Sequence, residues 1–240
     1  MQKYKKTNDT SYALGTELTL ELLKYHPRET VSVYVHSKQK DNEIYRQIIK
    51  LCKENRIEVI NSDKAFNIVD AKDNCYIMGV FKKFRNDIRK DRNHVVLVNP
   101  SNMGNLGTII RSCVGFGIND LAIIAPAADI YDPKVIRASM RAFFGLHFSY
   151  YQSFEEYLND VSKREVFPFM LDGEVKLHEV KVPERYSLVF GNEATGLPAE
   201  FHEYGTSVVI EQLNTIDSFN LDNAVSIGIY EFTRGKLQEK

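Results

Sequence analysis

The chain has 240 residues, of which 43% are hydrophobic and 26% charged, and its 31 Lys and Arg nearly balance its 32 Asp and Glu. This is an ordinary globular composition, long enough for one large or two small domains. No apolar run approaches the length of a membrane span, and the opening MQKYKKTNDT lacks the apolar core of a signal peptide, so we expect a cytoplasmic protein. The three cysteines show no paired spacing and the six histidines do not cluster with them, so neither a disulfide framework nor a metal site is expected.

The first part of the chain has the pattern of a compact α/β unit. Leu14, Leu18, Leu22 and Tyr25 lie on one helical stripe and predict a helix over residues 11–25. Further apolar and amphipathic runs predict strands over 31–36, 57–60 and 75–84, and helices over 43–55 and 64–69. Together these elements predict a first domain over residues 1–85.

A charged run separates this unit from the rest of the chain. KKFRNDIRKDRN, from Lys82 to Asn93, has little apolar content, so we place a linker at residues 86–93 and a second domain at residues 94–240. Residues 1–93 hold 19 Lys and Arg against 13 Asp and Glu, a net charge of +6. Residues 94–240 hold the other 12 Lys and Arg and 19 Asp and Glu, a net charge of −7. A basic first module suits neutralisation of nucleic-acid phosphates, although the same charges also fit the solvated faces of a small domain.

Strand and helix patterns alternate in the second domain. The strands are predicted near 95–98, 121–124, 146–151, 166–171, 187–190 and 207–210, and the helices near 105–115, 133–143, 153–163 and 219–236. Alternation of this kind predicts a mostly parallel sheet with helices on both faces.

Two loops in this domain carry glycine and polar residues. After strand 95–98 a glycine-rich loop leads into a helix, in which Asn105 and Arg111 lie nearly two turns apart and can face one side. After strand 187–190, in GNEATGLP, Gly191 and Gly196 permit tight turns and close approach of a ligand. This segment matches neither the Walker loop nor the G-x-G-x-x-G fingerprint. Taken alone, Arg111 also fits a solvated surface charge. The glycine loop also fits a simple connection between a strand and the next element.

A third polar segment precedes the last helical pattern. Asp217 or Ser218 is placed near the N-cap of this helix, and Ser218 also fits a plain capping role. Asn220 would lie in the first turn, where Asn is a poor helix former, which suggests a role for its side chain outside the helix. Gly228 in the helix interior indicates close packing against another backbone.

Together, three segments resemble the three motifs of the SpoU (TrmH) family of RNA ribose 2′-O-methyltransferases: NMGNLGTIIRSCVGFGI, LVFGNEATGLP and VVIEQLNTIDSFNLDNAVSIGIYE. KVIRASMRAFFGLHF resembles a segment that the family carries between its first two motifs. The resemblance is close from Asn93 to the C-terminus. The first 85 residues resemble, more loosely, the small ribosomal-protein-like substrate-binding domain of many SpoU proteins.

The resemblance implies a fold, a cofactor and partners. The fold would include a C-terminal trefoil knot, a rare exception to unknotted connection. The cofactor would be S-adenosyl-L-methionine, and the methyl acceptor an RNA ribose 2′-hydroxyl. Ribosomal RNA, in particular 23S rRNA, is favoured over tRNA, because the N-terminal module resembles that of the rRNA-modifying branch. A homodimer packed through the knots is also implied, with the active site completed across the interface.

Motif matching also implies the site residues. The catalytic group would be Asn105, Arg111, Glu193, Ser218 and Asn220. The cofactor, held largely by main chain, would lie at Val189, Gly191, Asn192, Gly196, Ile210, Ser218 and Leu221. The family's arginine has been assigned as proton acceptor, but Arg is not readily deprotonated in proteins. We therefore expect Arg111 to orient the hydroxyl and an adjoining phosphate, with Glu193 and Asn105 holding Arg111 and the loops in place.

The chain departs from the family pattern at three positions. Glu211 stands where Pro is common, Phe219 where the motif usually has Leu, and Arg141 where a small residue is usual. The polar catalytic types are all retained. Two alternatives stay open: a methyltransferase acting on a tRNA ribose or an RNA base, and a non-catalytic RNA-binding protein that kept the fold.

Overall fold

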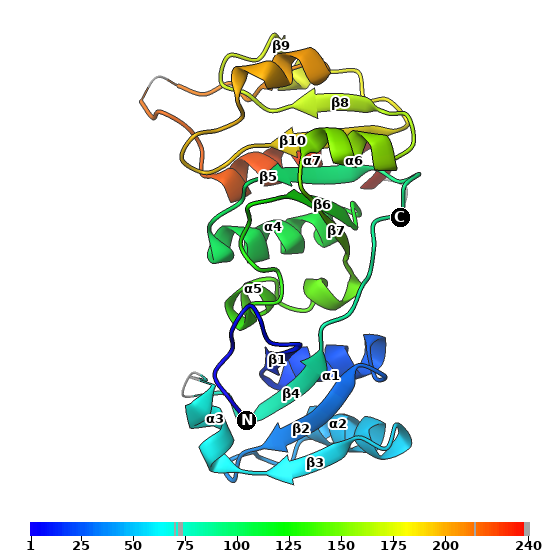
Figure 1. The fold of residues 1–240 in the computed structure, drawn as a ribbon, viewed down its shortest axis with the longest axis vertical. Coiled ribbons are helices and arrows are strands. Elements are labelled where there is room, and N and C mark those ends of the chain that lie inside the picture. The colour runs from blue at the N-terminus through cyan, green and yellow to red at the C-terminus, as the bar shows by residue number, and fades with distance from the viewer. Residues whose placement is uncertain (70, 72–73, 214, 238–240) are drawn as a thin grey trace. The chain divides into compact units, whose positions relative to one another are not determined.

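The computed structural model describes residues 1–69, 71, 74–213 and 215–237, and they form two compact units. The first unit combines Met1–Arg85 with Asp129–Gly145, and the second combines Asn86–Ala128 with Leu146–Lys240. Figure 1 traces the chain through both units. Each unit is therefore assembled from two stretches that are separated in the sequence. No helix among the described residues is long and apolar enough to cross a membrane.

The first stretch of the first unit, up to Arg85, forms a mixed sheet with three helices among its described residues. Its strands lie in the order β1-β4-β2-β3, with β1–β4 and β4–β2 antiparallel and β2–β3 parallel. The strands are β1 (Thr10–Leu14), β2 (Thr30–Val35), β3 (Glu58–Asn61) and β4 (Ile77–Lys82), and the helices α1 (Thr16–Tyr25), α2 (Glu43–Glu54) and α3 (Asp63–Ile68). Two clusters of buried side chains hold the unit together, one with Leu23, Ile48 and Val33 and the other with Phe66 and Met78.

The start of this unit differs from the helix expected over residues 11–25. Residues 10–14 form β1, which pairs along its whole length with β4, from Thr10↔Lys82 to Leu14↔Met78. Gly15, with φ of 116°, then turns the chain into α1. Because only Gly adopts this φ readily, the strand ends there and the helical stripe begins at Thr16.

The segment 129–145 also differs from its expected place in the second domain. It contains α5 (Pro133–Ala138) and a short 3-10 helix, η1 (Ala142–Gly145), and it belongs to the first unit. The helix expected over 133–143 ends early, since Met140 has a positive φ of 55°. Phe143 and Phe144 are fully buried, with ring centroids 6.4 Å and 5.9 Å from that of Phe81. These aromatic contacts explain why the segment packs with residues far earlier in the chain.

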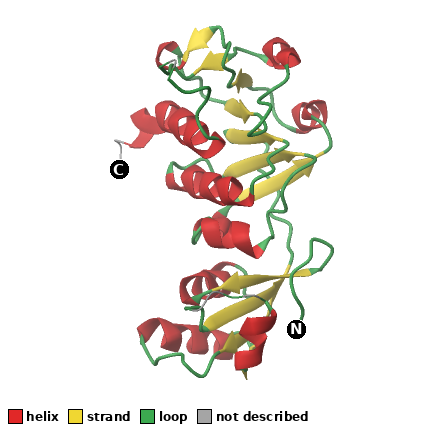
Figure 2. Cartoon of the chain, turned by 90° about the vertical axis from the view of Figure 1, so that its left-hand side faces the viewer, coloured by secondary structure: helices red, strands yellow, loops and turns green. Residues whose placement is uncertain are grey.

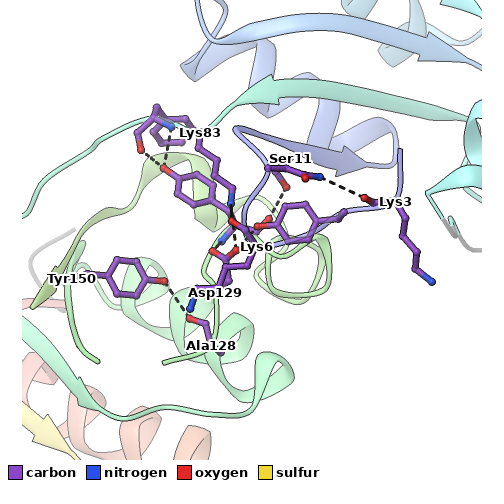
Figure 3. A network of polar contacts seen from close by, with 11 residues as sticks. Lys3, Lys6, Ser11, Lys83, Ala128, Asp129 and Tyr150 are labelled. Carbon is purple, nitrogen blue, oxygen red and sulfur yellow. Dashed lines mark hydrogen bonds and ion pairs between the residues drawn. The ribbon is translucent and has the colours of Figure 1, made fainter. Parts of the chain in front are cut away.

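Polar contacts fix the beginning of the same segment (Figure 3). The Asp129 carboxylate accepts a hydrogen bond from the Tyr4 hydroxyl and forms an ion pair with Lys83 at 3.4 Å. Ser11 Oγ donates to the carbonyl of Tyr131 at 2.6 Å. Arg141, one of the departures from the family pattern, lies 3.8 Å from Glu17, with both side chains largely exposed.

Residues 86–93, expected to be a linker, are packed into the second unit. Asn86 donates to the carbonyl of Leu146 at 2.6 Å, and Ile88 is buried. Arg89 forms a two-pronged ion pair with the buried Asp120, with its shortest N–O distance 2.7 Å. The charges that suggested a solvated linker thus include a partner for a buried carboxylate.

The second unit contains the mostly parallel sheet expected from the sequence. All neighbouring strands in the order β7-β6-β5-β10-β8 are parallel. The strands are β5 (His94–Val98), β6 (Asp120–Ile124), β7 (His147–Tyr151), β8 (Glu165–Pro168) and β10 (Tyr186–Phe190). Two short strands, β9 (Val175–Lys176) and β11 (Val208–Val209), form a separate parallel pair.

Helices cover both faces of this sheet, as Figure 2 shows. On one face α6 (Phe154–Asp160) and the 3-10 helix η3 (Ala199–Tyr204) bury Tyr157 and Phe201 against alternate strand residues such as Val96 and Val189. On the other face lie α4 (Met103–Gly115) and α7 (Leu221–Leu237). A Cβ at Gly228 of α7 would lie 2.8 Å from the Phe169 ring, so the close packing expected at this glycine is against aromatic side chains.

Candidate active site

Three loops meet beside the carboxyl ends of β5 and β10. The first runs from Asn99 to Asn102, the second from Gly191 to Leu197, and the third is the segment that enters α7. Glu193 joins the first two, because its carboxylate accepts from Ser101 N at 3.1 Å, Ser101 Oγ at 2.8 Å and Asn102 N at 2.9 Å. In an α/β sheet this edge is where ligands bind.

The hydrogen bonds keep Glu193 ionised. Burial alone would raise the pKa of this carboxyl. The backbone N–H groups of Asn102 and Ser101 stabilise the charged form more strongly, so the pKa lies below its usual value. The carboxylate therefore acts as a fixed negative acceptor between two loops.

The expected pairing of Glu193 with Arg111 is not found. Arg111 lies on α4 with its side chain exposed, and no described residue forms a hydrogen bond or ion pair with it. Glu193 lies beside the loop that precedes α4, and its carboxylate accepts hydrogen bonds from the N–H groups of that loop. The guanidinium of Arg111 is left available for a ligand.

Asn105 and Asn220 form a reciprocal amide pair. Asn105 Nδ2 lies 3.1 Å from Asn220 Oδ1, and Asn220 Nδ2 lies 3.4 Å from Asn105 Oδ1. Asn105 Nδ2 also lies 3.4 Å from Glu193. The pair connects α4 to the start of α7 and so joins the third loop to the other two.

The cap of α7 differs from the expectation. The carbonyl of Asn220 accepts the first helical hydrogen bond, from Ala224 N at 3.0 Å, and its side chain accepts from Leu221 N at 2.9 Å. Asn220 is therefore the N-cap residue and does not lie in the first turn. Ser218, two residues earlier, is exposed and lines the cleft described next.

A cleft with a volume of about 330 Å³ opens between these loops. Six of the seven residues expected at a cofactor site line it: Gly191, Asn192, Gly196, Ile210, Ser218 and Leu221. Val189 does not, because its side chain is fully buried against the opposite helical layer. Successive side chains of a strand point to opposite faces, and Val189 points away from the cleft. Asn214, in the third motif, lies outside the described residues.

Part of the lining was not identified from the sequence. The loop after β8 contributes four residues, Phe169 to Asp172, where a strand was expected to continue to residue 171. The sequence signal that the strand ends and a loop begins was the turn-forming Asp172-Gly173 pair. A Cβ on Gly173 would lie 2.4 Å from the Val208 carbonyl carbon, so only Gly fits there.

The two remaining departures from the family pattern have different surroundings. Phe219 lines the cleft and adds aromatic surface to it. Glu211 forms an ion pair with Lys176 at 2.8 Å, and its other carboxylate oxygen lies 3.1 Å from His178 Nδ1. The hydrogen bond from Lys176 lowers the pKa of Glu211. The Lys176 ion pair links the start of the third loop to β9.

The lining of this cleft suits a nucleoside-like organic ligand. Phe219, Leu221 and Ala224 offer apolar surface, and two glycines expose main chain. Gly196 has a φ of 66°, and a Cβ built on it would meet no atom within 4 Å, so this stretch of backbone is open to a ligand. No group of His, Cys, Asp and Glu among the described residues could hold a metal ion.

The chain is similar to known proteins in sequence over its later part and, in fold, over nearly its whole length. The model of the SpoU rRNA methylase family matches residues 92–230. A crystal structure of an AdoMet-bound rRNA methyltransferase from Sinorhizobium meliloti superimposes with a TM-score of 0.79 at 20% identity, covering 95% of this chain and 88% of that one.

Two curated relatives act on different RNAs. The 23S rRNA (uridine(2479)-2′-O)-methyltransferase of Streptomyces viridochromogenes is 29% identical over 158 residues, which are 62% of this chain and 55% of that protein. The tRNA (cytidine(34)-2′-O)-methyltransferase of Saccharophagus degradans is 32% identical over 150 residues, 59% of this chain and 94% of that protein. The match thus spans about half the length of the first relative.

Proposed function

The chain belongs to the SpoU rRNA methylase family, and from this we propose that it transfers a methyl group from S-adenosyl-L-methionine to a ribose 2′-hydroxyl of RNA. The observation that carries the proposal is the junction of the three motif loops. Glu193 binds the loop before α4, and Asn105 pairs with Asn220 at the start of α7, beside a cleft lined by the glycine loop. Such a junction can hold two substrates in a fixed relative position.

The cleft would bind the cofactor. When bound, S-adenosyl-L-methionine supplies an electrophilic methyl group on its sulfonium sulfur. The main chain of the glycine loop and of Ile210 would offer hydrogen-bonding groups, and Phe219 and Leu221 apolar surface for a purine ring. Ser218 would contact either the cofactor or the RNA.

Arg111 would position the RNA. Its exposed guanidinium has no hydrogen-bond partner among the described residues, so it can bind a phosphate beside the reacting ribose. Because Arg stays protonated, the 2′-hydroxyl proton would leave to phosphate or water. Glu193, Asn105 and Asn220 would keep the loops in the geometry that the reaction needs.

We favour ribosomal RNA, and 23S rRNA in particular, as the substrate. Two observations support this choice over tRNA. In fold, the rRNA methyltransferase from S. meliloti covers 95% of this chain, whereas a solved structure described for 2-OH methylation of C/U34 on tRNA covers 61% of it. The basic first part, with a net charge of +6, suits an additional RNA-binding module. The second candidate is a tRNA ribose, which the 32% identity to the tRNA enzyme favours.

Membership of the family also leads us to propose a trefoil knot between residues 186 and 237 and a cytoplasmic homodimer. The exposure of Ile227 and Tyr230 on α7 supports dimerisation, because apolar side chains on one helix face favour association. Arg111, exposed on the neighbouring α4, would then be able to reach a site shared by two copies. Light scattering on the purified protein would measure the mass of the assembly.

A direct test uses labelled S-adenosyl-L-methionine with separated rRNA and tRNA from cells that lack this protein. The proposal predicts label in 23S rRNA and none in tRNA. Label in tRNA alone would establish the second candidate. Cofactor binding without transfer to either RNA would point to a non-catalytic RNA-binding protein.

A further inference from the structure

Three polar side chains form a connected chain beside the cleft. Asp172 Oδ2 lies 3.3 Å from His202 Nε2, and His202 Nδ1 lies 3.0 Å from Ser207 Oγ. Asp172 follows β8, His202 lies on η3 and Ser207 directly precedes β11. These contacts link three elements of the second unit.

The order of residue types resembles a nucleophile, base and acid, but the burial of the serine excludes this chemistry. Ser207 is fully buried, and its Oγ accepts the backbone N–H of Glu174 at 3.1 Å. With that lone pair occupied, its O–H is free to donate to His202 Nδ1. A neutral His202 whose Nδ1 accepts this hydrogen bond carries its proton on Nε2, the atom that lies 3.3 Å from Asp172 Oδ2. His202 is thus placed between the buried serine and one carboxylate.

That carboxylate lines the cleft. Asp172 is 74% exposed, and its Oδ1 has no hydrogen-bond partner among the residues that the structure describes. The other acidic residue of the lining, Glu193, is occupied by the loop before α4. Gly173 fixes the turn that carries Asp172, because its Cα lies against the main chain of Val208. Asp172 is therefore an exposed acceptor beside the cleft, with His202 next to one carboxylate oxygen and the other oxygen open.

The position of Asp172 in the sheet indicates which donor it would bind. Its loop leaves β8, and β8 is the parallel neighbour of β10, which carries the glycine loop. In dinucleotide-binding sheets a glycine loop and a carboxylate at the ends of adjacent parallel strands bind one nucleotide, and the carboxylate accepts from a ribose hydroxyl. The same two features lie here at the ends of adjacent strands.

We infer that Asp172 is a cofactor-binding residue that accepts hydrogen bonds from the ribose hydroxyls of S-adenosyl-L-methionine, and that His202 is the residue that positions it. The inference rests on the proposed function. It adds to the cleft a contact with the nucleoside part of the cofactor, made by a side chain from a loop outside the three motifs.

Calorimetry with two ligands tests the inference. S-Adenosylhomocysteine carries both the ribose and the amino-acid part of the cofactor, whereas methylthioadenosine carries the ribose without the α-ammonium group. Asp172→Asn should weaken binding of both ligands about tenfold or more, as expected for loss of a hydrogen bond to a charged acceptor. Glu174→Gln is the matched control, because Glu174 is exposed in the same loop, is absent from the cleft lining, and should leave both affinities unchanged.

His202 variants test the positioning role. His202→Gln retains a donor toward Asp172 and should bind both ligands nearly as wild type does, whereas His202→Leu should weaken both severalfold. The melting temperature of each variant shows whether it has folded. Wild-type affinity for both ligands in Asp172→Asn would overturn the inference, and weakening for S-adenosylhomocysteine alone would assign Asp172 to the α-ammonium group instead. Failure of the wild type to bind either ligand would overturn the proposed function itself, and the inference with it.

Discussion

At the scale of single residues, the junction of the loops depends on the charge of Glu193. A glutamine there would turn an amide N–H₂ toward donors or leave one of them unpaired. We predict that Glu193→Gln lowers single-turnover methyl transfer about 100-fold, because small displacements of positioning groups have effects of this size. Glu200→Gln, an exposed carboxylate outside the cleft lining, serves as the control and should transfer at the wild-type rate.

A second residue-scale prediction concerns the buried His94. Its Nε2 lies 3.0 Å from the carbonyl of Arg89 and must donate, and its Nδ1 faces the Arg164 guanidinium at 2.8 Å and must accept. Burial, together with the charge of Arg164, lowers the pKa of His94 to about 4. The ring is therefore neutral in the folded protein at neutral pH.

As the pH falls, His94 binds a proton in the unfolded chain before it does so in the folded protein. Stability from neutral His94 is complete above about pH 6.5 and is lost progressively toward pH 4, at a total cost of about 3 kcal/mol. Denaturant unfolding at a series of pH values should show this loss, and an NMR titration should find no protonation of His94 above about pH 5. A His94 signal that titrates near 6.5 would contradict the account.

Residue types at the site could be predicted from the sequence, but their partners could not. Gly191 of the glycine loop and Ser218 of the third motif, both singled out from the sequence, line the cleft. Glu193 binds the loop at Ser101 and not Arg111. Which of these two groups lies within hydrogen-bond range depends on how the fold brings together residues some ninety positions apart in the sequence. Local patterns carry no information on such distances.

At the scale of elements, the loop from Gly191 to Leu197 turns back on itself so tightly that only Gly fits at its start. A Cβ on Gly191 would lie 2.1 Å from the Gly196 carbonyl carbon. We predict that Gly191→Ala destabilises the fold by about 1–3 kcal/mol through overpacking and weakens S-adenosylhomocysteine binding at least about tenfold. Gly115→Ala, on α4 where a Cβ meets nothing within 4 Å, should leave the affinity unchanged in calorimetry and should not lower the melting temperature, because Ala favours a helix more than Gly does.

The buried strands were the elements predicted best. Strands β5, β6 and β10 are buried at every residue, and each extends one residue before the mainly apolar run predicted for it. β1 was mistaken for helix, because its apolar residues also fit a helical stripe and its partner β4 lies some sixty residues away. The two-residue strands β9 and β11 are too short to leave a periodic signal.

At the scale of the whole molecule, the first unit depends on a segment from the middle of the sequence. Phe143 is fully buried among the rings of Phe81, Phe84 and Tyr131. We predict that Phe143→Ala costs about 3–5 kcal/mol, as expected for a large buried aromatic side chain. Hydrogen exchange should accelerate in β1 and β4 of the first unit while β5 and β10 of the second stay protected. Equal acceleration in both units would contradict the assignment of residues 129–145 to the first.

This division of the chain could not be predicted from composition. The charged run at residues 82–93 marks the boundary near Arg85, yet it gives no sign that residues 129–145 return to the first unit. That return depends on aromatic packing between stretches some sixty residues apart in the sequence, such as Phe81 against Phe143 and Phe144.

The central claim is that the loop junction methylates an RNA ribose with the help of Arg111. The most direct test is to incubate undermethylated ribosomal RNA with labelled S-adenosyl-L-methionine and to map every 2′-O-methyl group, for wild type and for Arg111→Ala. The account predicts label on one ribose of 23S rRNA with wild type, and a loss of transfer with Arg111→Ala while cofactor binding stays unchanged. Unlabelled RNA with wild type, or full transfer by the variant, would contradict it.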